Sequence, residues 1–480
     1  MILDEKDLII AQQREIIAAQ AALIEELQEK LKRLEMRVAE LEERLNKNSR
    51  NSSKPPSSDP PWAKPKRELE NGERRKRGGQ PGHDKHERPL LPPEKVDEII
   101  AVKPTRCAGC GATIIGADPE PERHQVFELP KIKPTVTEYQ IHTLTCACGA
   151  RTRGELPAGV TRSAFGPNLV AVVGWLTGKF RLSKRSVVEM LADLLGTEVS
   201  TGAVCKMERE ASAALAAPVE EACAHVKAQP VAHMDETGWR QCNKKAWLWV
   251  VVTPLCAVFH IATSRGALVA KRLLGEAFAG VLATDRWNAY TFVDTIRRQL
   301  CWAHLIRDFR AFVERGGASR RIGEDLLRVV EEFFKWWHKL HDGEISRKAF
   351  RRRMGPVIDR VDALLRAGSR CRNRKTAGTC EHILGLEWAL WTFVFADDVE
   401  PTNNFAERTL RPAVLWRRTS FGTQSEGGSR FVERILTTTA TLKLQDRHVL
   451  TYLSQAIAAH RRGEHVQSLL PQPTQALAVA

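Results

Sequence analysis

The first 48 residues of the chain repeat an apolar position every seven residues. The first apolar position of each heptad holds Ile10, Ile17, Ile24, Leu31, Val38 and Leu45. The second holds Gln13 and Gln20 in the early heptads, then Leu27, Leu34 and Leu41. β-Branched residues at the first position and leucine at the second favour a parallel two-stranded coiled coil. We expect a coiled coil over residues 1–48, tightest from about Ile24 to Leu45. The alternative is one amphipathic helix packed on its own protein.

Residues 49–95 change in composition to Ser, Pro and Lys, a mixture that cannot bury a core. We therefore expect a disordered basic linker there. It includes "RRKRGGQPGH", residues 74–83, in which Arg and Lys flank Gly-Gly and Pro-Gly. Such a segment could lie in a DNA minor groove as an extended arm. It could equally be a solvated linker that binds nucleic acid without specificity.

Two short cysteine motifs, "RCAGCGA" and "LTCACGAR", lie in residues 96–158. They supply the thiols of Cys107, Cys110, Cys146 and Cys148. Four thiolates in two close pairs suit tetrahedral Zn²⁺, and the glycine after each pair allows a tight turn. We expect a closed four-cysteine module with a structural Zn²⁺, although the second pair is C-x-C instead of C-x-x-C. Reduced cysteines in a small β module are the alternative.

Residues 159–226 are predicted to be helical. "LSKRSVVEMLADLLG" is typical of an amphipathic helix that ends at Gly196, and a second helix is expected to begin after Ser200 or Thr201. Two helices joined by a short turn are compatible with a helix-turn-helix, whose second helix enters the major groove of DNA. An ordinary helical hairpin has the same pattern, so DNA reading by this region remains one of two interpretations.

After Lys227 the pattern changes to short apolar, β-branched runs. "QPVAHMDETGW", "KAWLWVVVT" and "LCAVFHIAT" predict three consecutive strands. A helix, a fourth strand ending at Asp285 and a fifth strand that passes into a helix follow. This order matches the start of a ribonuclease-H-like sheet, in which the ends of the first and fourth strands lie side by side. We therefore expect Asp235 and Asp285 to be neighbours in an α/β catalytic core.

About a hundred mostly helical residues then interrupt the predicted core. We expect the first part of the core over 227–310, an all-α insertion over 311–398, the last part of the core over 399–445, and a C-terminal helix and tail over 446–480. The insertion tryptophans are expected in its own core: Trp336, Trp337, Trp388 and Trp391. Its basic runs could contact phosphates or form a solvated face. Cys371, Cys380 and His382 are weaker candidates for metal ligands.

Two carboxylates held close together repel each other, so the predicted pair needs a cation. Mg²⁺, or Mn²⁺, takes oxygen ligands, and two such ions about 3.5–4 Å apart hold the attacking and leaving oxygens of a phosphodiester. A third carboxylate should come from a later helix. The candidate is Glu407 in "PTNNFAERTLRPAVLWRR", where the Asn pair could cap the helix. A surface ion pair with Arg408 or Arg411 is the alternative.

The composition narrows the class of partner. The 480 residues include 73 Lys and Arg against 58 Asp and Glu, a net charge of +15 that favours a polyanion. No basic amphipathic anchor, apolar run of membrane-spanning length or signal peptide stands out, which favours nucleic acid over membrane. Eleven scattered Cys argue against a disulfide scaffold. We expect a cytoplasmic, nucleoid-associated protein that binds double-stranded DNA.

Four segments in order resemble the catalytic segments of the insertion-sequence-66 family of bacterial transposases: "HMDETGW", "ATDRWNAY", "CWAHLIRDF" and "NNFAERTLRPAVLWRR". The resemblance implies a D-D-E transposase with Asp235, Asp285 and Glu407 as its acids and Mg²⁺ ligands. It also implies that small accessory proteins of the same element take part. The residues expected to support this site or to contact DNA are Glu236, Trp239, His304, Arg307, Asn404 and Arg408.

Details around the acids qualify this resemblance. Glu236 is expected beside the site and not in it, because adjacent strand residues face opposite sides of a sheet. Many relatives read Asp-Gly-Tyr where this chain reads Asp285-Arg286-Trp287, which puts the role of that turn in doubt. Cys301 and His304 form a C-x-x-H motif, but two ligands are too few for a closed Zn²⁺ site. We expect His304 to be a core or supporting residue near the acids.

The resulting hypothesis is a transposase with two Mg²⁺ ions at the three acids. One ion would activate water to cut the element's end and then activate the released 3′-OH to attack target DNA, while the other would stabilise the leaving 3′ oxygen. A homodimer or higher synaptic oligomer fits a reaction that holds two DNA ends. The alternatives are a non-catalytic DNA-binding regulator and a ribonuclease-H-fold nuclease that cuts without joining.

Overall fold

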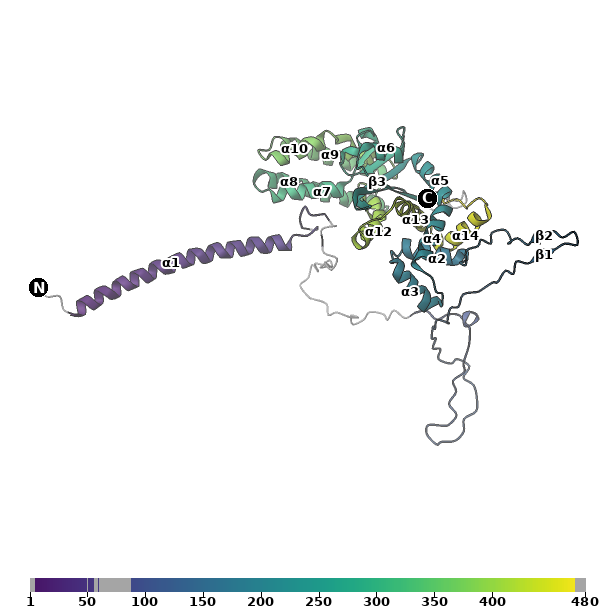
Figure 1. Ribbon diagram of the computed structural model, residues 1–480. Coiled ribbons are helices and arrows are strands. Elements are labelled where there is room, and N and C mark those ends of the chain that lie inside the picture. The colour runs from purple at the N-terminus through teal and green to yellow at the C-terminus, as the bar shows by residue number, and fades with distance from the viewer. Residues whose placement is uncertain (1–4, 50, 56–58, 60–87, 471–480) are drawn as a thin grey trace.

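The computed structural model describes residues 5–49, 51–55, 59 and 88–470. The basic segment 74–83, most of the expected linker and the last ten residues of the tail lie outside the described residues. A long N-terminal helix, an extended middle segment and a globular part follow one another (Figure 1). Over the described ranges, no helix combines the length and the apolar character needed to span a membrane.

The N-terminal helix α1 (Glu5–Asn46) projects away from the globular part (Figure 1). Its apolar heptad side chains are exposed, from 42% for Leu41 to 84% for Leu45, so the chain's own core does not cover them. The residues that follow it contact helix α7 (Trp302–Glu314). Glu314 accepts hydrogen bonds from the backbone N–H and the hydroxyl of Ser53, and Arg310 donates to the Ser49 carbonyl. The start of the expected linker is therefore anchored.

The middle segment from residue 88 to 166 contains little regular structure. It holds the 3₁₀ turn η2 (Pro93–Lys95) and one short antiparallel hairpin, β1 (Thr143–Thr145) with β2 (Arg151–Arg153). Most of its side chains are exposed. This segment therefore has no apolar core of its own in the single chain.

Four helices precede the main sheet: α2 (Pro167–Gly178), α3 (Lys184–Leu195), α4 (Thr201–Ala214) and α5 (Ala216–Lys227). The predicted boundaries of α3 and α4 agree with the structure. Gly196 ends α3 in the left-handed conformation with φ 57°, which suits glycine, and the Ser200 side chain caps α4 by accepting the Ala203 N–H at 3.1 Å. Helix α4 packs against α2, α13 and α14 and keeps Thr201, Lys206 and Arg209 exposed or half-exposed.

The sheet has five strands in the order β5-β4-β3-β6-β7. The strands are β3 (Val231–Gln241), β4 (Lys244–Thr253), β5 (Cys256–Ala262), β6 (Val281–Thr284) and β7 (Arg298–Leu300). The first three pair antiparallel, whereas β6 lies parallel to both β3 and β7. The expectation that the first and fourth strands are neighbours is therefore confirmed. Two 3₁₀ turns join β6 to β7: η3 (Asn288–Tyr290) and η4 (Thr295–Arg297).

Helices cover both faces of this sheet. Helix α5, helix α6 (Ala267–Leu274) and η3 bury one face around Met234, Trp249 and Leu282. The opposite face is covered by the N-terminal helices together with α12 (Asn404–Ser420), α13 (Glu426–Leu444) and α14 (Val449–Arg462). The sheet is therefore the middle of three layers, as its near-continuous apolar strands predict.

Helix α13 also closes the outer edge of the sheet. Three of its side chains, spaced four residues apart, accept alternate backbone N–H groups of β5. Glu433 accepts the N–H of Ile261, Thr437 that of Phe259, and Thr441 that of Ala257. The N–H groups of an edge strand point outward every second residue, and side chains at i, i+4 and i+8 share one helix face. The spacing of the side chains on α13 therefore matches the spacing of the outward N–H groups of β5. Since these N–H groups are already bonded, another chain cannot pair with this edge through them.

The predicted all-α insertion corresponds to a helical layer with a core of its own. It consists of α7, α8 (Gly317–His341), α9 (Arg347–Ser369), α10 (Arg374–Leu384), η5 (Glu387–Leu390) and α11 (Thr392–Phe395). Trp391 is buried, and Trp336 and Trp337 pack against this core. Trp388 was wrongly expected in the core: it is 69% exposed, because the short η5 turn presents it to solvent.

Candidate active site

The two predicted aspartates lie on neighbouring strands. Asp235 is inside β3, and Asp285 directly follows the end of β6. The register between these parallel strands ends with His233 opposite Ala283, two residues before each aspartate. Parallel strands lie about 4.8 Å apart, so this register brings the two carboxylates to the same level at one end of the sheet. Both residues are partly exposed.

Glu407 comes from the first turn of α12, which packs across β3 and β4. The sequence suggested that the Asn pair before it would cap this helix. Asn403 does occupy the N-cap position, but its side chain makes no capping hydrogen bond. Its amide instead donates to the Met234 carbonyl at 2.8 Å, and its oxygen lies 3.1 Å from Nδ1 of His233. Asn403 therefore fixes the start of α12 to the strand that carries Asp235.

Hydrogen bonds connect the residues next to all three acids. Cys301 donates its N–H to the carbonyl of Thr284, the residue before Asp285, at 2.8 Å. The Cys301 thiol accepts the N–H of Asn403 at 3.1 Å, and the Asn403 carbonyl accepts the N–H of Glu407 at 3.2 Å. Together with the bond from Asn403 to Met234, this chain of contacts holds β3, β6 and α12 in one arrangement.

The electrostatics agree with three carboxylates in one place. Burial, followed by the charges of Glu236, Asp285 and Glu407, raises the pKa of Asp235 well above its ordinary value. Burial also raises the pKa of Glu407, with a further increase from Asp285, while Arg307 lowers it. In the described part of the chain, neither Asp235 nor Asp285 forms an ion pair with a Lys, Arg or His. Their oxygen donors are of the kind that Mg²⁺ or Mn²⁺ binds, and their charges act on one another, but among the described residues the three carboxylates do not form one group of ligand atoms within 4.8 Å.

Glu236 points to the opposite face of the sheet. Its carboxylate is buried, pairs with Arg265 at 2.7 Å and accepts a short hydrogen bond from the Tyr290 hydroxyl. Burial raises the Glu236 pKa, and the Tyr290 hydrogen bond and Arg265 partly oppose that rise. The Arg265 guanidinium also lies over two indole rings, 4.9 Å from Trp247 and 4.1 Å from Trp287. Glu236 therefore anchors a polar network beneath the acids and is not placed to share a metal ion with Asp235.

The turn after Asp285, where the sequence departs from its relatives, has specific contacts. The Asp285 carboxylate accepts the N–H of Trp287 at 2.9 Å. Arg286 pairs with Asp308 of α7 at 2.6 Å and lies 3.0 Å from Nδ1 of His382 on α10. The Trp287 indole donates to the Arg265 carbonyl at 3.1 Å. Arg286 therefore joins this turn to the helical insertion.

The other residues predicted to support the site differ in how close to the acids they lie and in how exposed they are. Arg307 lies close enough to lower the pKa of Glu407 and of His304. Trp239 was expected to support the site or to contact DNA, yet it is buried against Trp416 of α12 with ring centroids 6.4 Å apart. A buried indole is not exposed for a DNA contact, and its packing on α12, the helix that carries Glu407, leaves the supporting role a prediction. Asn404 is half-buried and Arg408 is exposed beside Glu407.

Sequence reasoning missed four buried or half-buried residues that hold this site. Asn403, Tyr290, Arg265 and His233 each make one of the contacts described above. The sequence predicts only that the Asn pair caps the helix, which is the usual role of an asparagine at this position, and names Asn404 as the supporting residue. In a single sequence, nothing distinguishes a polar residue of a buried strand, such as His233, as a partner of the site. Asn403 does have a recognisable position, since it follows Pro401 and Thr402 at a helix start.

The C-x-x-H motif lies against the third acid. His304 Nδ1 is 3.5 Å from Glu407 Oε1, and Cys301 is buried next to them. Burial, followed by Arg307 and Arg286, lowers the His304 pKa to about 3, so this imidazole is neutral at physiological pH. The alternative of a surface ion pair between Glu407 and Arg408 or Arg411 is not what the structure contains. His304 therefore lies directly beside Glu407, and its role in supporting the acids stays a prediction.

The cysteine motifs form as separate local turns. In each, the N–H of a left-handed glycine donates to the carbonyl of the first cysteine at 2.9 Å: Gly111 to Cys107 and Gly149 to Cys146. The backbone N–H of Cys110 is the main cause of a lowered pKa of Cys107, and that of Cys148 does the same for Cys146. Each turn fits half of a Zn²⁺ site, but within the described residues the four thiols do not form one group of ligand atoms. The same holds for Cys371, Cys380 and His382.

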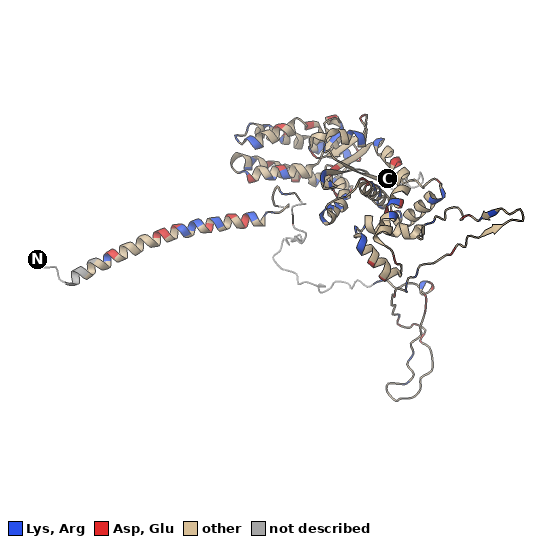
Figure 2. Cartoon of the chain, in the orientation of Figure 1, with Lys and Arg blue, Asp and Glu red and all other residues tan. Residues whose placement is uncertain are grey.

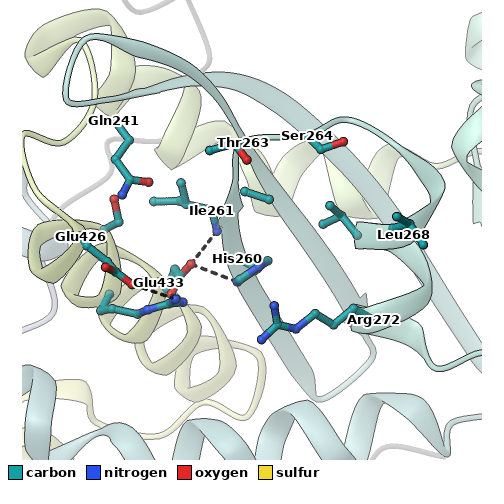
Figure 3. Close-up of a pocket in the computed structure, with 13 residues that line it drawn as sticks. Gln241, His260, Ile261, Thr263, Ser264, Leu268, Arg272, Glu426 and Glu433 are labelled. Atoms are coloured by element: carbon teal, nitrogen blue, oxygen red, sulfur yellow. Dashed lines mark hydrogen bonds and ion pairs between the residues drawn. The ribbon is translucent and has the colours of Figure 1, made fainter.

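A separate polar hollow of about 380 Å³ lies at the outer edge of the sheet, between β5, α6 and α13 (Figure 3). Glu433 is at its centre and accepts from Ile261 N–H at 2.7 Å, from His260 at 3.0 Å and from Arg430 at 2.9 Å. Since this carboxylate also closes the sheet edge, its partners have a structural explanation. None of the predicted site residues lines the hollow.

Basic side chains are spread over the globular part, whereas α1 carries both signs along its length (Figure 2). Residues 5–46 contain more Asp and Glu than Lys and Arg. The positive net charge of +15 therefore belongs to the rest of the chain. A binding surface for a polyanion is accordingly expected on the globular part and the basic middle segments and not on α1.

Comparison with known proteins relates this region to a described family. The model of the transposase IS66 family matches residues 162–430, which include Asp235, Asp285 and Glu407. A family of unknown function (DUF6444) matches residues 10–89, over most of α1 and the expected linker. The uncharacterized protein y4qI of Sinorhizobium fredii (strain NBRC 101917 / NGR234) is 25% identical over 417 residues, covering 79% of this chain and 75% of that protein. The uncharacterized protein y4hP of the same organism is 25% identical over 409 residues, covering 75% and 72%.

Proposed function

Because the chain belongs to the IS66 family of transposases, we propose that it cuts the ends of an insertion sequence and joins them to target DNA. The reaction takes place at Asp235, Asp285 and Glu407, which bind Mg²⁺ or Mn²⁺. The observation that carries this proposal is the convergence of three carboxylates from separate segments, with the charges of Asp285 and Glu407 acting on Asp235. Such mutual repulsion in a partly buried site favours a bound divalent cation.

The architecture supports the same proposal. Three antiparallel strands followed by two parallel ones, in the order β5-β4-β3-β6-β7, is the arrangement expected of a ribonuclease-H-like core. In this core Asp235 comes from the first strand, Asp285 follows the fourth, and Glu407 comes from a helix packed on the first. The helical insertion separates the second acid from the third in sequence, while Asn403 and Cys301 reconnect them in space.

Each part of the site has a proposed role. Bound Mg²⁺ ions supply a nucleophile at neutral pH and stabilise the charge that develops on the leaving oxygen. Asp235, Asp285 and Glu407 orient these ions, and Arg307 and Arg408 are placed to attract DNA phosphates near the acids. The buried network of Glu236, Tyr290 and Arg265 supports the strand beneath Asp235.

The remaining modules are proposed to bind and align DNA. The exposed apolar positions of α1 support pairing with α1 of a second chain, and a dimer or higher oligomer can hold two DNA ends. The exposed side of α4, with Lys206 and Arg209, is available for a DNA groove. The two cysteine turns would bring Cys107, Cys110, Cys146 and Cys148 to a structural Zn²⁺ if they meet. Small accessory proteins of the same element remain part of the proposal.

The test uses purified full-length protein, Mg²⁺ or Mn²⁺, and labelled DNA that carries the gene's own flanking sequences. We expect metal-dependent nicking at a defined end, loss of nicking in Glu407→Gln, and retention in Glu344→Gln, an exposed glutamate of the insertion. Joining of the cut end to a second DNA distinguishes the transposase from a nuclease that only cuts. Tight DNA binding without cutting, also after addition of the neighbouring small proteins, would favour a DNA-binding regulator instead.

A further inference from the structure

A pair of buried polar atoms lies unpartnered beside the acid site. His304 Nδ1 and Glu407 Oε1 are 3.5 Å apart, and neither atom has a hydrogen-bond partner among the described residues. Buried polar atoms are nearly always paired, because an unpaired one costs roughly 1–3 kcal/mol. The third nearby atom is Sγ of Cys301, which is 1% exposed. One ligand atom from each of Cys301, His304 and Glu407 lies within 4.8 Å of the other two, and no other trio of His, Cys, Asp or Glu in the described ranges does so.

The spacing of these atoms suits a small cation with mixed ligands. Zn²⁺ binds sulfur at about 2.3 Å and nitrogen or oxygen at about 2.0–2.2 Å, so two of its tetrahedral ligand atoms lie roughly 3.4–3.6 Å apart. The observed distance of 3.5 Å between His304 Nδ1 and Glu407 Oε1 falls in this range. A thiolate and a carboxylate would also neutralise the charge of a divalent ion.

The chemistry of the ligands distinguishes this trio from the three acids. Thiolate and imidazole select Zn²⁺, whereas Mg²⁺ requires oxygen. Cys301 is the N-cap of α7, and His304 stands three residues later, where its N–H donates to the Cys301 carbonyl at 3.0 Å. This turn places both side chains on one side of the helix start. Burial raises the pKa of the Cys301 thiol to about 11, and the N–H of Asn403 only partly opposes that rise, so the thiol would give up its proton on binding the cation.

We propose that Cys301, His304 and Glu407 form a Zn²⁺ site with one open coordination position, next to the Mg²⁺ site. The ion holds Oε1 of Glu407 and leaves Oε2 for the acid site, so it orients the third acid. The C-x-x-H motif thereby gains the third ligand that its sequence lacks. This inference deepens the proposed function and rests on it, because Glu407 belongs to both sites.

The test measures metal binding without DNA. The parent is a full-length variant in which Cys107, Cys110, Cys146 and Cys148 are changed to Ser, which removes the other thiols expected to bind zinc. These residues lie in the extended middle segment outside the apolar cores. Zn²⁺ content after removal of free metal is determined by elemental analysis, and Co²⁺ is substituted to record thiolate-to-cobalt charge-transfer absorption. Cys301→Ser and His304→Gln are added separately, with Cys380→Ser as the control for loss of another buried thiol.

We expect about one Zn²⁺ per parent chain and a thiolate-to-cobalt band, both lost in Cys301→Ser, reduced in His304→Gln and retained in Cys380→Ser. A parent that binds no Zn²⁺, or binds it without the thiolate band, overturns the proposal whatever the variants do. Zn²⁺ that persists in both Cys301→Ser and His304→Gln overturns it too. Mg²⁺-dependent DNA cleavage is scored separately. Cleavage by a protein that binds no Zn²⁺ would disprove only this site, and Zn²⁺ without cleavage would disprove only the transposase reaction.

Discussion

Asp235 and Asp285 lie at the same level on two parallel neighbouring strands, each two residues beyond the register pair of His233 and Ala283. Parallel strands separate equivalent residues by about 4.8 Å, so this register brings the two carboxylates close to each other where β6 ends beside β3. The repulsion is part of the cost of the site, and it explains why neighbouring acids add to the effect of burial in raising the pKa of Asp235. A divalent cation relieves that cost.

Asp235→Asn should separate stability from activity. Without metal, the buried carboxylate of Asp235 is repelled by the neighbouring acids, and an asparagine amide carries no charge. We therefore expect the substitution to increase the free energy of unfolding of the metal-free protein by about 1 kcal/mol. Cleavage should fall by more than about 100-fold, because a metal ligand is lost. Urea unfolding in the presence of a chelator and the nicking assay measure the two effects. Asp193→Asn, an exposed change on α3, should alter neither; a destabilised Asp235→Asn would contradict the repulsion.

The strand and helix order, and with it the pairing of Asp235 and Asp285, followed from apolar runs and their lengths. The side chains that hold the acids did not, because their partners are distant in sequence. Asn403 has the residue type and position of a helix cap, yet its amide bonds to β3. Trp239 was expected beside the acids or against DNA and Trp388 in a core, but the first is buried on α12 and the second faces solvent. Tertiary contacts decide such cases.

Asn403→Ala tests whether that asparagine positions Glu407. The change removes the hydrogen bonds to Met234 at 2.8 Å and to His233 at 3.1 Å, and we expect a loss of about 2–3 kcal/mol in unfolding free energy. The cleavage rate should fall by about 10–100-fold with unchanged DNA affinity, because the third acid shifts while the DNA surface does not. Asn373→Ala, which removes the side-chain cap at the start of α10, is the control for the loss of asparagine hydrogen bonds outside the acid site. Equal effects of both changes would disprove the positioning role.

His233 should make the stability depend on pH. Burial lowers its pKa to about 4 from an ordinary value of 6.5, so the unfolded chain binds a proton that the folded chain rejects between these values. Its contribution is therefore complete above pH 6.5 and is lost as pH falls toward 4, by about 3 kcal/mol in total. His233→Gln, which can still bond to Asn403, should flatten this part of the unfolding curve. His465→Gln, an exposed histidine, should not.

The exposed heptads of α1 predict self-association. Leu31 is 57% exposed and Leu34 is 63% exposed in the single chain, so alanine at both positions costs little within one chain but removes contacts between two. We expect Leu31→Ala with Leu34→Ala to shift the protein from dimer toward monomer in sedimentation equilibrium. Lys32→Ala with Arg33→Ala, on the neighbouring polar face, should leave the dimer intact. A monomeric wild-type protein at micromolar concentration would exclude this role of α1.

Arg286 gives the catalytic turn a connection that a glycine could not provide. Its guanidinium lies 2.6 Å from Asp308 of α7 and 3.0 Å from His382 of α10, directly beside Asp285. We expect Arg286→Ala to lower the unfolding free energy by about 1–2 kcal/mol, because a partly buried charged pair is broken. Amide exchange should accelerate in the turn after Asp285 and in α10, and the cleavage rate should fall several-fold.

The matched control for Arg286→Ala is Arg360→Ala, which breaks an exposed pair with Glu332 between α8 and α9. Exposed pairs contribute roughly 0–1 kcal/mol, so little change is expected in stability or exchange. Asp308→Asn should reproduce most of the effect of Arg286→Ala, since it removes the other partner of the same contact. If Arg286→Ala instead leaves exchange in α10 unchanged, the insertion does not restrain the turn, and Arg286 acts only through its charge next to the acids.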